Sequence, residues 1–284
     1  MKRLPVSRLL ACCLVALCLI TCAKVPYTNR TQLNLISPKQ DAALGAKFAE
    51  VVLSKTVLSE DAALKAQVER VGGRIAAVAD LPDADWRFYV IQNEIPNAFC
   101  LPGGKVFVFT GLFKIVENDE QLATVLGHEV GHVIARHGAE KRSQAILAGT
   151  IGGIAAGTVG AATQNPNAAR GVHGLYGAMA KIGYLLPASR TCEYEADRIG
   201  LILMAKAGYD PEQALGFWRN MIRYSAQTKH KGPPTLFSTH PADADRAANL
   251  EKLLPEARSY AGATAKTNWG DIAPAAAEGV DSFN

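Results

Sequence analysis

The sequence predicts an α+β fold that is mainly helical and contains a small β-sheet. Apolar residues at helical spacing run from Gln40 to about Ala79, and further helical patterns cover 118–138, 189–208 and 212–225. The segments WRFYVIQN and KVFVFTGL are rich in aromatic and β-branched residues and predict strands, with CLPGG between them as the turn. A chain of 284 residues, 49% apolar and 20% charged, is long enough to bury one substantial core.

The N-terminus carries the features of a targeting segment. Lys2, Arg3 and Arg8 precede an apolar run that ends at Cys22, and the first 21 residues contain no acidic residue. The run is too short for a comfortable membrane span, so it predicts an export signal of the lipoprotein type over 1–21 with a lipid on Cys22. Ordinary cleavage and a retained anchor are the alternatives.

This leader sets the expected organisation and location of the chain. We expect a lipid-anchored tether over 22–40, one domain over 41–261 and a flexible tail over 262–284. The lipid would attach the protein to a membrane. The expected location is the bacterial cell envelope, facing the periplasm, and more specifically the outer membrane.

The charge of the remaining chain is balanced. Of 30 basic residues, three lie in the leader, which leaves 27 basic against 26 acidic residues, a net charge of about +1. No basic stripe indicates nucleic acid as a partner. Nothing in the sequence indicates an oligomeric state.

Two cysteines remain outside the leader. Cys12, Cys13, Cys18 and Cys22 belong to the N-terminal segment, whereas Cys100 and Cys192 lie in the folded body. In an oxidising compartment these two could form a disulfide, but two cysteines are no disulfide framework, and the sequence leaves open whether they pair.

The segment from Ile146 to Ala162 contains no charged residue over seventeen positions. Gly149, Gly153 and Gly157 are four residues apart, a spacing that permits close helix packing. Three interpretations stay open. The segment packs on the protein or covers its cleft, it dips into a membrane surface, or it spans a membrane.

The segment 118–138 is the best-specified helix, and it carries the chemistry. Asn118 is a plausible N-cap, Gln121 completes a capping box, and Gly138 is the expected stop. His128 and His132 lie one turn apart on the same face, with Glu129 beside them. This H-E-x-x-H pattern is typical of zinc hydrolases, in which the glutamate deprotonates the water held by the metal.

A catalytic zinc needs a third protein ligand and an open fourth position. His137 lies five residues after His132, which does not fit the known extended motif, and we expect it at the surface. Glu193 and Asp197 lie one turn apart on the helix over 189–208, so one carboxylate can reach a metal while the other supports a ligand histidine. Glu195, on the other side, is expected to be solvated.

Three motifs, HEVGH, SRTCEYEADRIG and STHPADADR, together resemble peptidase family forty-eight. This family contains zinc metalloendopeptidases of the gluzincin type, including CAAX prenyl proteases and bacterial lipoprotein proteases. The resemblance covers nearly the whole chain after the leader, including VPYTNRTQLNLIS and NAFCLPGGKVFVFTGL, and implies a zincin-like fold with one Zn²⁺ per chain.

The resemblance also implies a role for individual residues. His128, His132 and Glu193 would bind zinc, Glu129 would be the general base, and Asp197 would orient a ligand histidine. His240 and Arg246 would line the cleft and stabilise the oxyanion, and His240 is also a possible regulatory zinc ligand that holds the enzyme latent. An edge strand that binds extended substrate through its backbone is expected at Gly104, Lys105, Val106, Phe107 and Val108.

The function implied is zinc-dependent cleavage of peptide bonds in unfolded or misassembled envelope proteins, as part of periplasmic quality control. A rival interpretation is a catalytically silent or latent, chaperone-like scaffold of the same fold. The presence of the motif glutamate and of every expected ligand favours the enzyme.

Overall fold

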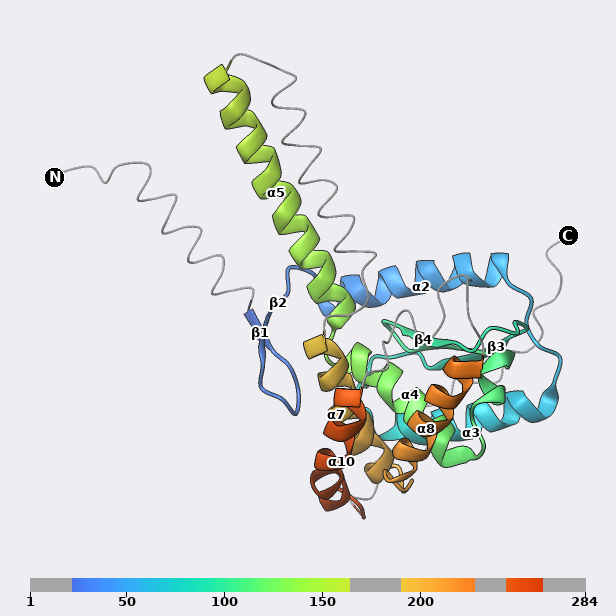
Figure 1. Ribbon diagram of the computed structural model, residues 1–284. Coiled ribbons are helices and arrows are strands. Elements are labelled where there is room, and N and C mark those ends of the chain that lie inside the picture. Colours follow the sequence, from blue (N-terminus) through green and yellow to red (C-terminus); the bar gives the residue numbers. More distant parts are fainter. Residues whose placement is uncertain (1–21, 164–189, 228–243, 263–284) are drawn as a thin grey trace, which may run out of the picture. The chain divides into compact units, whose positions relative to one another are not determined.

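The computed structural model describes residues 22–163, 190–227 and 244–262. These residues form two compact units (Figure 1). The first unit contains residues 22–38 and 136–163, and the second contains residues 39–135, 190–227 and 244–262. The prediction of a mainly helical α+β fold with a small β-sheet is confirmed.

The first unit begins with a two-stranded antiparallel sheet. Strand β1 (Cys22–Lys24) pairs with β2 (Thr31–Leu33), and Cys22 lies opposite Leu33. The prediction of an extended tether is therefore wrong for this stretch. Strands of three residues are too short to show an alternating pattern that the sequence could reveal. Acylation of Cys22 stays a prediction.

Helix α5 (His137–Thr163) belongs to the same unit and holds this sheet in place. The guanidinium of Arg30 donates two hydrogen bonds, of 2.8 and 2.7 Å, to the carboxylate of Glu140. The Ser143 hydroxyl accepts a hydrogen bond from the Leu35 N–H at 2.8 Å. His137, predicted at the surface, is buried here with 3% of its area exposed.

The charge-free segment 146–162 lies within α5. Ile146 and Leu147, at its start, are 52% and 42% exposed. Within the described part of the chain, no helix has the length and apolar character that crossing a membrane requires. A cover over the cleft and contact with a membrane surface stay predictions.

The second unit contains a three-stranded sheet in the order β3-β5-β4. Strand β3 (Arg87–Ile91) runs parallel to β5 (Lys105–Phe109), and β4 (Ala98–Leu101) pairs with β5 in the antiparallel direction. The turn between β4 and β5 uses Gly103 and Gly104, with φ angles of 85° and 87° that favour glycine.

The expected edge strand is therefore the central strand of this sheet. Val106, Phe107 and Val108 are completely buried, because β5 has a neighbour on each side and a covered surface on each face. The outer side of β3 is also paired. The Ser59 N–H donates to Val90 O at 2.8 Å, and the Gln92 N–H donates to Val57 O at 2.8 Å. In the part of the chain that the structure describes, β4 is the edge strand without a further pairing partner.

Helices cover both faces of the sheet (Figure 1). On one face, Ala49 of α2 (Pro38–Lys55) packs with Ile91 and Phe107. On the other face lie α3 (Ala62–Val78) and α4 (Asp119–Ile134). Gly72 of α3 approaches Phe88 so closely that an added Cβ would lie 2.3 Å from its ring. Among the three strands, β4 makes the most contact with α4.

The remaining helices pack on the far side of α4. They are α7 (Arg190–Lys206), α8 (Gln213–Gln227) and α10 (Ala244–Ser259). The contact between α4 and α7 is the most extensive one between any two described elements. Helix α7 ends at Lys206, two residues before the predicted stop Gly208, which has a φ of 77°. A short 3₁₀ turn, η1 (Thr110–Lys114), leads from β5 towards α4.

Candidate metal centre

Helix α4 fixes the positions of His128, Glu129 and His132. Its N-terminus is capped as predicted, because the Asn118 side chain accepts the Gln121 N–H at 2.8 Å. The helix ends earlier than predicted. Arg136 adopts a left-handed conformation with φ of 54°, and the expected stop, Gly138, lies within α5. Most of α4 is buried, so His128 is held in the interior of the second unit, and His132 is partly buried.

Helix α7 brings Glu193 and Asp197 to the same place. Both carboxylates are buried, with 2% and 5% of their residue areas exposed. The spacing of four residues puts them on one helix face, as the sequence predicts. Glu195 lies on the same helix but is also buried, with 5% exposed, so the expectation that it is solvated is wrong.

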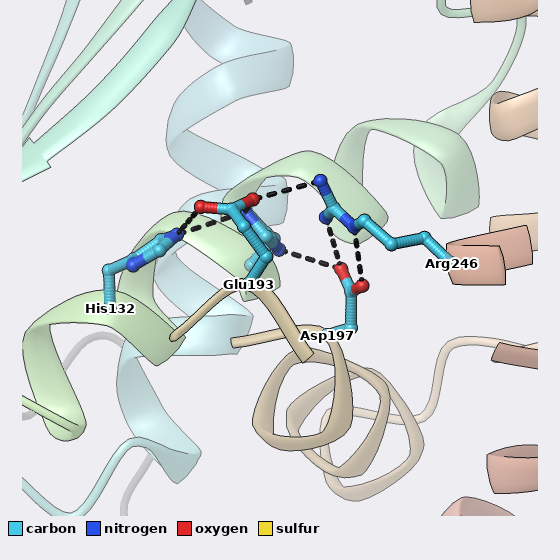
Figure 2. Close-up of polar contacts among 5 residues, drawn as sticks. His132, Glu193, Asp197 and Arg246 are labelled. Atoms are coloured by element: carbon cyan, nitrogen blue, oxygen red, sulfur yellow. Dashed lines mark hydrogen bonds and ion pairs between the residues drawn. The ribbon is translucent and has the colours of Figure 1, made fainter. Parts of the chain in front are cut away.

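The side chains of His128, His132 and Glu193 converge on one point (Figure 2). The two Nε2 atoms are 3.0 Å apart, His128 Nε2 lies 3.5 Å from Glu193 Oε2, and His132 Nε2 lies 3.5 Å from Glu193 Oε1. Ligand atoms of a tetrahedral zinc at 2.0–2.1 Å are separated by about 3.3 Å. The three side chains therefore fit a zinc ion without rearrangement.

Glycines allow α4 and α7 to approach this closely. A Cβ added to Gly127 would lie 2.9 Å from Gly200 O, and one added to Gly131 would lie 2.9 Å from Ala196 O. On the facing helix, a Cβ added to Gly200 would lie 2.9 Å from His128 N. The helices thus meet backbone to backbone beside the metal ligands. The sequence analysis missed this role, although glycines four apart in a helix, each directly before a motif histidine, were a usable signal.

Asp197 orients the first histidine. His128 Nδ1 lies 2.9 Å from Asp197 Oδ1, and because a carboxylate only accepts, Nδ1 carries the proton and Nε2 is left for a metal. Burial opposes a charge on His128, but the hydrogen bonds and charges of Asp197 and Glu193 outweigh it and raise the pKa of His128 to about 10. The same carboxylates that raise this pKa also favour a bound cation.

Arg246 occupies a different position from the one expected. Its guanidinium donates from Nε and Nη2 to Asp197 at 2.9 and 2.7 Å, and Nη1 lies 2.8 Å from Glu193 Oε2. The ring of Trp218 covers it, with 4.4 Å between Cζ and the ring centroid. Arg246 is only 2% exposed. The prediction that it stabilises the oxyanion is not supported by this geometry, because its donors point at the two carboxylates.

The charges of the buried cluster call for a cation. With His128 and His132 neutral, as metal ligands must be, Glu129, Glu193 and Asp197 carry three negative charges when ionised and Arg246 carries one positive charge, which leaves two negative charges in the cluster. Uncompensated buried charges are costly. A divalent ion among the ligands would balance the cluster, which supports a metal such as zinc at this position.

Glu129 lies beside the ligands and lines a cavity with His128. The space not filled by protein atoms is about 440 Å³, part of it open to solvent. Apart from the site residues, its walls are mainly apolar and come from α7, α8 and α10. The main apolar residues are Leu201, Met204, Phe217, Trp218, Met221 and Leu250. The cavity therefore joins a candidate general base to an apolar surface.

Three further residues named in the sequence analysis are His240, Cys100 and Cys192. His240 lies outside the described residues. No disulfide joins Cys100 and Cys192 in the structure. Burial, together with the charge of Glu129, raises the pKa of the Cys100 thiol, which makes it a poor nucleophile.

Known proteins are similar to most of this chain. The model of Peptidase family M48 matches residues 62–254. The mitochondrial metalloendopeptidase OMA1 of Schizosaccharomyces pombe is 36% identical over 238 residues, which cover 82% of this chain and 67% of that protein. Human OMA1 is 31% identical over 239 residues, covering 82% and 46% respectively. A putative β-barrel assembly-enhancing protease of Vibrio cholerae is 29% identical over 278 residues, covering 92% and 54%.

These relatives contradict the predicted location in the bacterial outer membrane. Mitochondrial enzymes from fungi, animals and a plant reach up to 37% identity, whereas the bacterial assembly-enhancing proteases reach 29% and 30%. The leader misled the prediction for a physical reason. A basic segment without acidic residues is typical of mitochondrial targeting as well as of bacterial export.

Proposed function

We propose that the chain, which belongs to Peptidase family M48 and is a zinc metalloendopeptidase, cleaves unfolded or misassembled proteins. The observation that carries the proposal is the convergence of two imidazoles and one carboxylate beside a buried glutamate. The zincin-like fold and the use of zinc are consistent with the family.

In this proposal His128, His132 and Glu193 hold the zinc, and Glu129 is the general base. When bound, zinc supplies Lewis-acid chemistry that lowers the pKa of water and polarises the carbonyl of the substrate. Glu129 takes a proton from the attacking water and passes it to the leaving amine. Asp197 keeps the Nδ1 proton of His128 in place, so that Nε2 always faces the metal.

The open edge of β4 is the proposed place for the substrate backbone. It takes over the role that the sequence analysis gave to β5, because no described strand pairs with the outer side of β4, and because β4 packs on the helix that carries Glu129. An extended peptide can add to such an edge through main-chain hydrogen bonds, which impose little sequence preference. A folded protein seldom offers an unpaired extended segment, so this mode of binding favours unfolded chains.

Misassembled membrane proteins are part of the proposed substrate class. The Vibrio cholerae and Yersinia pestis relatives are named for enhancing β-barrel assembly, which gives this class its support. The rival interpretation, a catalytically silent scaffold, would not require a buried glutamate beside three converging ligands. We therefore set the scaffold aside in favour of the protease.

The first test is digestion of casein, an unfolded protein, by the purified protein. We expect cleavage that stops when a chelator removes the metal and returns when zinc is added back, with one zinc bound per active chain. Cleavage that persists without metal would contradict a zinc enzyme. A chain that binds zinc and leaves casein intact would favour the scaffold.

The cavity beside Glu129 predicts a preference for an apolar side chain next to the cleaved bond. Leu250 lines this cavity and is 2% exposed. Replacing Leu250 with Phe should fill the space and lower kcat/KM for peptides with a large apolar side chain there by about tenfold or more, relative to small ones. Cleavage of a peptide series that differs only at that position measures this.

The matched control is Leu254→Ala. Leu254 lies one turn later on α10, is 5% exposed and does not line the cavity. This variant should lose stability by about 2–5 kcal/mol, as buried leucines do, with its side-chain preference unchanged. An equal change of preference in both variants would show that the effect comes from the packing of α10 and not from the cavity.

A further inference from the structure

Arg246 makes contacts that distinguish the two oxygens of the expected zinc ligand Glu193 (Figure 2). Each oxygen lies 3.5 Å from one imidazole, Oε2 from His128 Nε2 and Oε1 from His132 Nε2, but it is Oε2 that also lies 2.8 Å from Arg246 Nη1. Arg246 and Glu193 are both 2% exposed, so water hardly competes for these contacts. Oε2 thus lies beside a guanidinium as well as an imidazole, whereas Oε1 faces the second imidazole.

Several contacts fix the guanidinium in this position. Its Nε and Nη2 donate to the two oxygens of Asp197, and the ring of Trp218 covers the face of the guanidinium. Asp197 is in turn hydrogen-bonded to His128. A planar guanidinium with three fixed contacts cannot rotate to follow a moving carboxylate, which a lysine ammonium could do.

A carboxylate can bind a metal ion through one oxygen or through both. A catalytic zinc needs three protein ligands and one position left for water or substrate. A second oxygen from Glu193 would compete for that position. Arg246 would compete with a metal for Oε2, because this oxygen already accepts from its guanidinium.

We propose that Arg246 is a positioning residue that makes Glu193 a one-oxygen ligand. By holding Oε2, it leaves only Oε1 for the metal and keeps a coordination position open for water. This inference rests on the proposed function for the identity of the ligands. It replaces the expected oxyanion role of Arg246 with an action through Glu193.

The test uses the full-length protein with cobalt in place of zinc, because the visible absorption of Co²⁺ reports its coordination number. Two variants remove the contact. Arg246→Lys keeps the positive charge but loses the planar guanidinium that contacts Asp197 and Glu193 together, and Arg246→Met loses both the charge and these contacts. We expect weaker visible absorption in both variants, since an added oxygen raises the coordination number above four. We also expect kcat to fall about 10–100-fold, with KM and metal affinity retained.

The matched control is Arg198→Met. Arg198 forms a comparable two-nitrogen contact with Glu256, and it joins the same two helices, α7 and α10, away from the metal ligands. This variant should keep the cobalt spectrum and the kcat of the natural protein. A changed spectrum in Arg198→Met would show that the docking of α10, and not the contact with Oε2, sets the coordination.

Two other outcomes would overturn the proposal. A fall in kcat with an unchanged cobalt spectrum would return Arg246 to a role in stabilising the oxyanion. Loss of metal binding in Arg246→Lys would make Arg246 a purely structural residue. If Arg246→Met does not fold, the lysine variant alone decides. If the natural protein binds cobalt without cleaving casein, the proposed function fails, but the spectra still decide how Glu193 binds.

Discussion

Replacing Glu129 with Gln should lower the rate of casein cleavage by roughly 10²–10⁴-fold while zinc stays bound. Glutamine has the size of glutamate and keeps a polar side chain in the buried position, which is 4% exposed, but it offers no basic oxygen. Glu129 is not one of the three converging ligands, so the metal should remain. Zinc content and the initial cleavage rate, measured on the same preparation, check both parts.

A suitable control for this variant is Glu195→Gln. Glu195 is also a buried carboxylate of the second unit, with 5% exposed, but it is not among the metal-binding residues. It should keep both zinc and cleavage. Loss of zinc from Glu129→Gln would contradict the assignment of Glu129 as a base that is not a ligand. A rate equal to that of the natural protein would remove Glu129 from the mechanism.

The local part of this site could be predicted from the sequence. The cap at Asn118 and the pair His128 and His132 lie within one helix, where periodicity alone decides which side chains share a face. The convergence of Glu193 with that pair depends on the packing of α4 against α7. Spacing alone could not establish it, and only the resemblance to a family pointed to this residue.

The errors in the prediction share a cause, because each depends on a partner that lies far away in the sequence. The place of β5 in its sheet depends on a parallel partner, β3, that is distant in the sequence, and no local pattern records which strand becomes the edge. The run KVFVF nevertheless held a warning, since a strand without polar alternation is typical of one buried on both faces. Arg246 is a similar case. Its partners lie 49 and 53 residues earlier in the chain, at Asp197 and Glu193, and its own surroundings in the sequence look like an exposed helix start.

Replacing Gly200 with Ala should cause the largest loss of zinc affinity among variants that leave every ligand in place. The new Cβ would lie 2.9 Å from His128 N, a backbone atom at the start of the metal-binding motif. Neither helix can yield locally, so α4 and α7 must move apart, and the ligands from the two helices separate. We expect zinc affinity to fall about 10–100-fold or more, with stability lower by about 1–3 kcal/mol through overpacking. Zinc titration and thermal unfolding measure the two effects.

The control is the same substitution where no atom opposes it. A Cβ added to Gly149, within α5, meets nothing within 4 Å. Gly149→Ala should leave zinc affinity unchanged and favour the helix by up to about 1 kcal/mol, because alanine is the better helix former. In Gly200→Ala the same gain in helix propensity is opposed by the clash of the new Cβ with His128 N. If that variant binds zinc as tightly as the natural protein, close approach of the two helices is not what holds the ligands together.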